Sequence, residues 1–152
     1  MKIREATIDD VPTLKMFLQG IVEAERPMDA CLQPEHIEYY DPADFINNSD
    51  SMLLVAEKSG ALVACGAGSI KASKHYYVHD KHLYLAMMYV LPEYRGQGIN
   101  QKILEGLIEW GRQNNVTYCK LTVYPQNTGA IKAYEKLGFE SVLLEMRLRP
   151  ET

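Results

Sequence analysis

Apolar and polar residues alternate at the start of the chain, and helical spacing follows. Residues 2–8, KIREATI, alternate as in a half-buried strand. From residue 11 to residue 22 apolar side chains recur at helical spacing, and Thr7 to Asp10 supply capping residues in front of them. The pattern predicts a strand followed by a helix.

Prolines interrupt the pattern that comes next. Pro27, Pro34 and Pro42 exclude one long helix, because proline lacks the N–H that an interior helical position requires. We expect a short helix around residues 35–40, another near residues 43–48, and loop elsewhere in this part.

A hairpin and a third strand are predicted after these short helices. Residues 51–58 and 61–71 are apolar runs on either side of Gly60, which suits a tight turn. The third strand covers residues 82–91 and ends at Pro92, which cannot donate a ladder hydrogen bond.

Helix and strand alternate in the rest of the chain. An amphipathic helix begins at Ile99, and VTYCKLTVY (116–124) reads as a strand that forms a β-α-β crossover with the strand before the helix. A helix from Asn127 to Leu137, with Gly138 as its C-terminal stop, and a final strand over residues 139–148 complete a mixed α/β pattern.

Length and composition narrow the class of protein. The 152 residues, 47% of them hydrophobic, predict a single domain over residues 1–152. No apolar segment of membrane-spanning length occurs, so no membrane partner is expected. Cys31, Cys65 and Cys119 are odd in number and lack metal-ligand spacing, which favours a reducing, cytoplasmic compartment.

Charge is concentrated in one segment. The net charge is −4, but residues 23–50 contain eight acids and one base and so carry −7. A basic surface for nucleic acid is absent, and no nucleic-acid partner is expected. The acidic segment has two interpretations: a binding site for a small cation, or solvated helix faces, which give the same count more often.

The stretch RGQGIN (95–100) lies between a predicted strand end and a predicted helix start. Such a turn is a potential anion site, because the first N–H groups of a helix are unpaired and its dipole is positive there. Two phosphate motifs fail: the dinucleotide fingerprint would need glycine at Gln101, and the P-loop ending Gly-Lys-Ser/Thr is missing. GAGS (66–69) has no helix after it and reads as packing or a bulge.

LYLAMMYVLPEYRGQGINQKIL followed by YPQNTGAIKAYEKLGF closely resembles the GNAT superfamily of N-acetyltransferases. The family signature Arg/Gln-x-x-Gly-x-Gly/Ala matches Arg95 and Gly98, with Asn100 in place of a small residue. The later family positions are matched by Asn127, Ala130, Tyr134, Gly138 and Phe139, and the opening IREATIDDVPTL is also similar to a GNAT start.

The resemblance implies a GNAT-like fold: a central, mostly antiparallel twisted sheet of six to seven strands, with a parallel pair splayed at the cofactor site, and about four helices around it. It also implies acetyl-CoA as cosubstrate and a possible homodimer. The pyrophosphate would bind the amides of Arg95, Gly96, Gln97, Gly98, Ile99, Asn100 and Gln101, and the pantetheine arm the backbone of Met88, Tyr89 and Val90. Asn100 would either point away, join the phosphate contacts or cap the helix.

Acyl transfer from a thioester to an amine expels a thiolate, to which a nearby hydroxyl can supply a proton. By resemblance Tyr134 is this general acid, and Asn127 helps to hold the cofactor. The plainer interpretation of Tyr134 is a core tyrosine at helical spacing.

The acceptor amine must lose a proton before it attacks, since its pKa is about 10.4 if it is lysine-like. Family members use a strand glutamate, but residues 82–91 contain no carboxylate. A water relay through Tyr84 or His82 is one hypothesis. Glu23 and Glu25, near the end of the first helix, are rivals that would also attract an ammonium group.

Three interpretations of function stay open. The first is N-acetylation of a small cationic amine, the second is N-acetylation of a protein or peptide, and the third is a module that binds acyl-CoA without turnover. No metal is expected, because His75, His79 and His82 lack a recognised ligand spacing.

Overall fold

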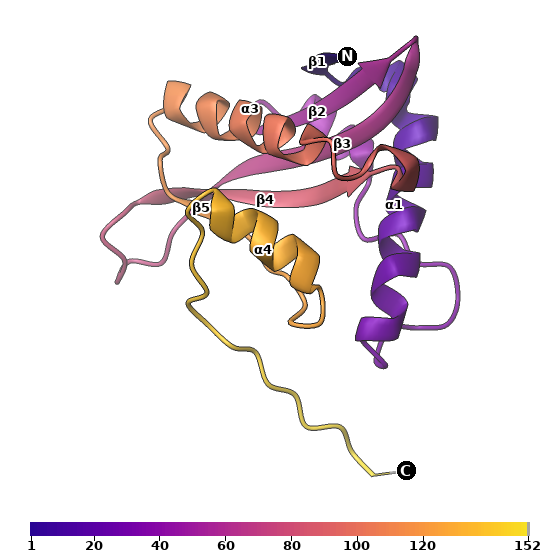
Figure 1. The fold of residues 1–152 in the computed structure, drawn as a ribbon. Coiled ribbons are helices and arrows are strands. Elements are labelled where there is room, and N and C mark those ends of the chain that lie inside the picture. The colour runs from indigo at the N-terminus through magenta and orange to yellow at the C-terminus, as the bar shows by residue number, and fades with distance from the viewer. Residues whose placement is uncertain (152) are drawn as a thin grey trace.

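A five-stranded sheet in the order β1-β2-β3-β4-β5 forms the centre of the computed structural model, which describes residues 1–151. The strands are β1 (Lys2–Glu5), β2 (Ser51–Lys58), β3 (Ala61–Ala72), β4 (Lys81–Val90) and β5 (Cys119–Lys120). The helices are α1 (Val11–Glu25), α2 (Pro42–Asn47), α3 (Ile99–Gln113) and α4 (Thr128–Lys136), with short 3-10 turns η1 (Ile8–Asp10), η2 (Arg26–Met28) and η3 (Pro92–Tyr94). Figure 1 shows α1 on one side of the sheet and α3 on the other.

Each face of the sheet has its own apolar core, because side chains alternate along a strand. On β2, Leu53 and Val55 pack with α1, whereas Leu54 and Ala56 pack with α3. The run of apolar residues in β2 therefore marks a strand that is covered on both faces.

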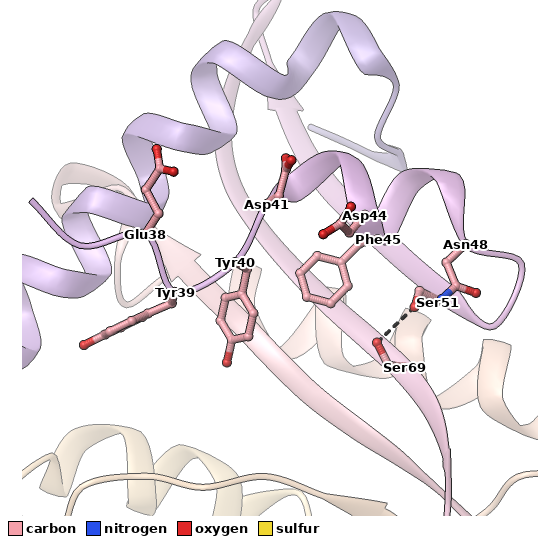
Figure 2. A pocket seen from close by; sticks show the side chains of 9 residues that line it. All are labelled: Glu38, Tyr39, Tyr40, Asp41, Asp44, Phe45, Asn48, Ser51 and Ser69. Carbon is pink, nitrogen blue, oxygen red and sulfur yellow. Dashed lines mark hydrogen bonds between the residues drawn. The ribbon is translucent and has the colours of Figure 1, made fainter.

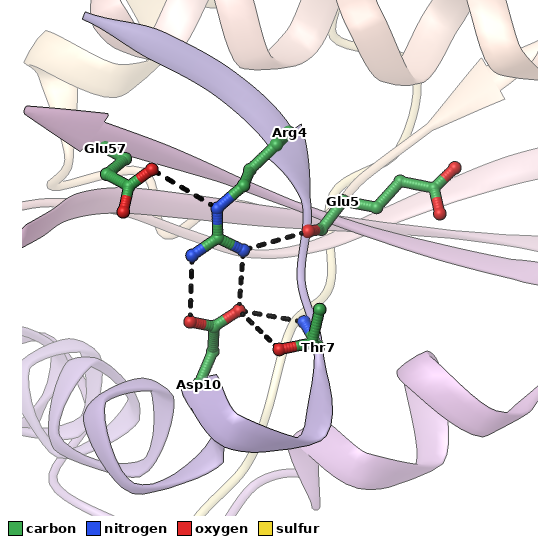
Figure 3. Close-up of polar contacts among 5 residues, drawn as sticks. All are labelled: Arg4, Glu5, Thr7, Asp10 and Glu57. Carbon is green, nitrogen blue, oxygen red and sulfur yellow. Dashed lines mark hydrogen bonds and ion pairs between the residues drawn. The ribbon is translucent and has the colours of Figure 1, made fainter. Parts of the chain in front are cut away.

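A polar cluster fixes the junction between β1 and α1 (Figure 3). The Arg4 guanidinium donates to both carboxylate oxygens of Asp10, at 2.8 and 3.0 Å, and to Glu57 on β2 at 3.4 Å. The Thr7 amide donates to the same Asp10 carboxylate at 2.8 Å. The hydrogen bond from Arg4 lowers the pKa of Asp10 below its usual value. Asp10 thus joins the first strand, the sheet and the entry of α1.

An irregularity in β3 and β4 confirms the interpretation of GAGS. The register shifts between Cys65 and Ala67, and Met87 on β4 has a positive φ of 56°. A Cβ at Gly66 would lie 2.7 Å from the side chains of Met88 and Ile103. Gly66 therefore permits both the bulge and the close approach of α3 to the sheet.

The two parallel strands pair over a short distance and then separate. β4 and β5 are matched only at Leu83 with Cys119 and Tyr84 with Lys120. β4 continues to Val90 against β3, while residues 121–124 run on without a ladder partner. The predicted parallel pair next to the glycine turn is confirmed, and it opens toward α1 and α4.

Three details of the expected fold are wrong. The sheet has five strands within residues 1–151, fewer than the six to seven expected, and residues 139–148 are extended without joining it. β5, the last strand of the sheet, is only two residues long. Residues 139–148 therefore have no edge strand of their own length to pair with within residues 1–151 of the same chain. Residues 35–40 form no helix, because the Arg26 side chain takes up the carbonyl oxygens of Gln33 and Glu35.

Candidate active site

The turn into α3 forms a cradle of free amides. Gly96 and Gly98 both have φ of 78°, a left-handed conformation that favours glycine, and space around both is open. The amides of Gly96, Gln97 and Gly98 have no acceptor within residues 1–151, and the first amides of α3 lack one by helix geometry. Gly98 is the N-cap, so Asn100 lies inside the first turn and does not cap the helix.

Arg95 is the first residue of the RGQGIN motif, and its side chain also contacts the end of β4. Its Nε donates to the Val90 carbonyl oxygen at 2.9 Å, and its guanidinium lies 5.6 Å from the centre of the Tyr89 ring. This contact fixes the end of β4 relative to the glycine turn. One of the strand groups expected to meet a pantetheine arm is therefore already hydrogen-bonded to a side chain.

Tyr89 also connects β4 to α1. Its ring lies 5.2 Å from the ring of Phe17, and a Cβ at Gly20 would lie 2.6 Å from the Tyr89 side chain. Gly20 thus allows α1 to pass close to the end of β4 where Met88, Tyr89 and Val90 lie.

Helix α4 carries Asn127 and Tyr134. Asn127 is its N-cap, and its side-chain oxygen accepts from the Ala130 amide at 3.3 Å. The Tyr134 ring packs edge-on against Phe139 at 5.7 Å, and its side chain is half-buried. Burial raises the pKa of the Tyr134 hydroxyl, and the negative charge of Glu25 adds to the effect. The hydroxyl is therefore protonated at neutral pH.

Glu25, at the end of α1, lies among these groups. Burial raises the pKa of its carboxyl, the Tyr39 hydroxyl opposes this rise, and repulsion from Asp29 adds a smaller increase. The negative charge of Glu25 contributes to the raised pKa values of Tyr134 on α4 and of Tyr39 and Tyr40, which are adjacent in the loop before α2. Glu25 is thus a half-buried carboxylate on the open side of the separating strands.

Glu23 differs from Glu25 although both are on the same helix. Its carboxylate accepts from Arg26 at 2.9 Å, and its side chain is 66% exposed. The structure therefore brings Glu25, and not Glu23, into the neighbourhood of Tyr134.

Tyr84 and His82 lie two residues apart on β4, and their side chains contact different residues. The hydroxyl oxygens of Tyr84 and Thr122 lie 3.2 Å apart where the strands separate. His82 is buried, and its Nδ1 lies 2.9 Å from the Ser73 hydroxyl, which also contacts His79. Burial, with nearby Lys120, lowers the pKa of His82, so its imidazole is neutral at pH 7.

An open cavity of about 480 Å³ lies beside α2, next to Ser51 of β2 and Ser69 of β3. Figure 2 shows the rings of Tyr40 and Phe45 together in it, and their centres are 5.5 Å apart. Ser69 of the lining is paired with Tyr84 across β3 and β4, so this cavity lies next to the strand that carries Tyr84. Burial and then Tyr84 raise the pKa of Tyr40. The lining residues are Glu38, Tyr39, Tyr40, Asp41, Asp44, Phe45, Asn48, Ser51 and Ser69.

Tyr39 and Asp29 were not singled out from the sequence. The Tyr39 hydroxyl is buried and makes no hydrogen bond of good geometry in residues 1–151, and burial, followed by the adjacent Glu25 carboxylate, raises its pKa. The Asp29 carboxylate accepts from Tyr124 at 2.7 Å and from Arg147 at 2.7 Å. The acidic segment was the only signal for either residue, because their partners are far away in the sequence.

The glycine cradle, the separated strands and the Tyr134 helix occur together in one known family. Residues 18–139 match the Acetyltransferase (GNAT) family. The chain belongs to the GNAT family. Its family and its curated relatives show that it is an N-acetyltransferase, and therefore an acyltransferase enzyme.

Relatives and solved structures agree with this membership. A thialysine N-epsilon-acetyltransferase from Mus musculus is 31% identical over 152 residues, covering 93% of this GNAT chain and 85% of the relative. A mutant BH1408 protein from Bacillus halodurans has the same fold, with TM-score 0.88, 23% identity and coverage of 99% of this chain and 100% of that one. A Clostridium acetobutylicum protein described as a predicted acetyltransferase was solved with acetyl-CoA; it has TM-score 0.78, 20% identity and coverage of 97% and 95%.

The residues present fit the cosubstrate of the GNAT family. Two glycines in left-handed conformation, free amides and open space around them suit a pyrophosphate group. Acetyl-CoA, when bound, supplies a thioester whose carbonyl carbon accepts the amine. No cluster of metal-binding side chains is found in residues 1–151. No helix in the same part of the chain is at once long and apolar enough to cross a bilayer.

Proposed function

We propose that this single-domain GNAT enzyme acetylates a primary amine of a small cationic molecule. The observation that carries the proposal is the cavity next to Tyr84, which combines aromatic rings with acidic side chains. An ammonium group is attracted by carboxylates and by the faces of aromatic rings. Glu38, Asp41 and Asp44 supply the negative charge.

The cofactor residues are proposed on the basis of the cradle. The amides of residues 95–101 hold the pyrophosphate, with Asn100 contributing its amide in the first turn of α3. Met88, Tyr89 and Val90 present the strand end along which the pantetheine arm lies, and Arg95 keeps that end in place through the Val90 carbonyl. Asn127 acts on this site by fixing the start of α4.

Tyr134 is the proposed general acid. Its raised pKa keeps the proton on the hydroxyl until a thiolate forms nearby. The departing thiolate, whose conjugate thiol has an unperturbed pKa of about 8.5, accepts this proton and leaves as the free thiol.

Glu25 is the proposed base for the amine, acting directly or through water. It is half-buried, its pKa is raised, and it shares its surroundings with Tyr134 and Tyr40. Tyr84, at the point where the strands separate, would relay the proton. His82 is a weaker candidate, because Ser73 already contacts its Nδ1.

Two alternatives correspond to different acceptors or none. A peptide amine would need an open approach, which the exposed side of the cavity offers. An acyl-CoA-binding module without turnover would not need Glu25 and Tyr134 on facing elements. The relatives named for Nε-acetylation of thialysine support the small amine, and the three free cysteines accord with a cytoplasmic site of action.

A panel of acceptors with acetyl-CoA tests the proposal, with free thiol as the readout. The panel contains diamines, lysine-like amino acids, a neutral monoamine and a peptide N-terminus. We expect the highest kcat/KM for an acceptor with a second positive charge. Preference for the peptide, or hydrolysis alone, would contradict the proposal.

A charge variant sharpens the test. Asp44→Asn should raise the KM for a dicationic amine by about 5-fold, since one partly exposed ion pair contributes roughly 1 kcal/mol. Glu35→Gln removes a charge from the same acidic segment but not from the cavity lining. It is the matched control and should leave the KM unchanged.

A further inference from the structure

The Tyr39 hydroxyl is the only buried side-chain oxygen or nitrogen atom in residues 1–151 that makes no hydrogen bond of good geometry. Most buried polar groups in proteins are paired, because a buried group that lacks a partner has lost its contact with water without replacement. Phenylalanine would fill the same space without this cost. The hydroxyl therefore needs an explanation other than packing.

The loop that carries Tyr39 is fastened to α1 and to the turn that follows it. Gln19 on α1 donates through its side-chain amide to the Ile37 carbonyl oxygen at 2.8 Å. The Arg26 guanidinium donates to the Glu35 carbonyl oxygen, also at 2.8 Å. The backbone that leads into Tyr39 is therefore fixed against the helix that ends with Glu25.

The Tyr39 side chain points in its own direction. Figure 2 shows its ring turned away from the rings of Tyr40 and Phe45, which lie together. Its hydroxyl contacts the Glu25 carboxylate instead, and each of these two groups changes the pKa of the other. Burial and then Glu25 raise the pKa of Tyr39, while the hydroxyl opposes the rise that burial causes at Glu25.

Glu25 has no cation as a partner within residues 1–151. None of the ion pairs there includes its carboxylate, and the neighbouring Arg26 pairs with Glu23 instead. A carboxylate that is removed from water is costly unless hydrogen-bond donors stabilise its charge. The Tyr39 phenol is the donor that lies against it.

Other ionisable groups also surround Glu25. Asp29 raises the pKa of Glu25, but the Asp29 charge is itself met by Tyr124 and Arg147, at 2.7 Å each. The remaining groups whose pKa Glu25 raises are phenols, which stay protonated at neutral pH and add no charge; they are Tyr40, Tyr124 and Tyr134. The ionisation of Glu25 thus depends on its burial, on Asp29 and on Tyr39.

We propose that Tyr39 is a positioning residue of this enzyme, whose hydroxyl donates to the Glu25 carboxylate and holds it in the space that Glu25 shares with Tyr134. The inference rests on the proposed function, in which Glu25 takes the proton of the acceptor amine. Hydrogen bonds of a catalytic site are often long without substrate and shorten when it binds, which accords with the imperfect geometry of this contact. Tyr39 keeps its own proton, because burial and Glu25 both raise its pKa.

Direct titration of the Glu25 carboxyl tests the contact without any need for turnover. NMR of the full chain with glutamate labelled at its side-chain carboxyl follows the titration, and the signal missing from Glu25→Gln identifies Glu25. Tyr39→Phe takes away the group that lowers the Glu25 pKa, so the titration midpoint should move to higher pH. An unchanged midpoint, or one that moves to lower pH, would overturn the proposal.

The dependence of kcat/KM on pH gives a second readout, which a purely structural role would not move. In Tyr39→Phe the acidic limb should shift to higher pH, so that kcat/KM on the limb falls by about 5-fold while the plateau above it stays within about 2-fold of wild type. A lower plateau with an unmoved limb would assign Tyr39 to packing. A higher KM for the amine with an unmoved limb would assign it to the acceptor, and either result would contradict the proposal.

Tyr124→Phe is the matched control, because it removes a phenol oxygen of the same cluster that donates to Asp29. Its limb should stay at the wild-type pH, and an equal shift in both variants would refute a specific contact between Tyr39 and Glu25. Glu25→Gln separates failure of the proposed function from failure of this proposal. A limb that survives in Glu25→Gln would overturn the proposed base and the positioning role with it. A limb lost in Glu25→Gln, with an unchanged Glu25 titration in Tyr39→Phe, would overturn the role of Tyr39 alone.

Discussion

The side-chain oxygen atoms of Tyr84, at the last paired position of β4, and of Thr122, two residues beyond the end of β5, lie 3.2 Å apart. Beyond this point the two strands diverge, and Tyr40 from the acidic cavity lies near Tyr84. The hydroxyl pair thus lies where the strands separate, and Tyr84 is paired with Ser69 of the cavity lining.

Tyr84→Phe tests this position. If Tyr84 relays the proton from the amine, we expect kcat to fall by about 10-fold while the KM for acetyl-CoA is unchanged. Thr122→Val, which removes the hydrogen bond but keeps the phenol, is the comparison and should have a smaller effect. Equal activity of the wild type and Tyr84→Phe across the pH range would remove Tyr84 from the relay.

Tyr134→Phe should lower kcat by roughly 100-fold, the usual contribution of a general acid. The raised pKa of Tyr134 adds a pH signature. Because the hydroxyl stays protonated through mildly alkaline pH, the wild-type rate should not decline there through loss of this proton. An early alkaline decline in the wild type that persists in Tyr134→Phe would assign the decline to another group.

Glu25→Gln should remove the acidic limb of the kcat/KM profile. As a base Glu25 acts only when ionised, so the rate should rise with pH through its pKa, which lies above the ordinary carboxyl value. Glu23→Gln, a change on the same helix at a side chain that pairs with Arg26, should retain the limb. Identical profiles for the two variants would refute the distinction between them.

Gly98→Ala should raise the KM for acetyl-CoA and leave that for the amine unchanged. The φ of 78° at Gly98 is unfavourable for alanine by roughly 1–2 kcal/mol, and relaxation of the turn would displace the free amides. Gly60→Ala imposes the same kind of strain, at φ 81°, in the β2–β3 turn, outside the glycine motif. If both variants lose only thermal stability, the cradle does not bind the cofactor.

Asp10→Asn should destabilise the fold at neutral pH by roughly 1 kcal/mol, because it removes a partly buried, hydrogen-bonded ion pair with Arg4. The folded-state pKa of Asp10 is below its usual value, so the stabilisation is present above about pH 4 and is lost as pH falls through the folded-state pKa. Urea unfolding should therefore show a larger difference from wild type at pH 7 than at pH 3. Asp9→Asn, at an exposed neighbour, should match wild type at both.

Local patterns predicted the parts of the fold that depend on neighbours in sequence. The β2–β3 hairpin, the stop at Pro92 and the glycine at the end of α4 follow from alternation and backbone conformation, and the structure confirms each. The glycine turn and Tyr134 were found because their motif is contiguous.

The remaining features depend on contacts between distant residues. The prolines left room for a short helix at residues 35–40, yet Arg26 binds the carbonyl oxygen of Glu35 from outside this segment. Residues 139–148 were predicted as a strand, but the sequence of a segment does not say which edge of a sheet it joins. The contacts of Tyr39 and Asp29 exist only in the folded chain, where α1, the loop after it and Tyr124 come together.

The most direct test of the account is to incubate the enzyme with acetyl-CoA and a dicationic primary amine, and to measure released thiol and acetylated amine together. The account predicts equal amounts of the two products from the wild type, with both falling together in Tyr134→Phe. Thiol without acetylated amine, or neither product from any amine of the panel, would contradict the assignment of an amine acetyltransferase.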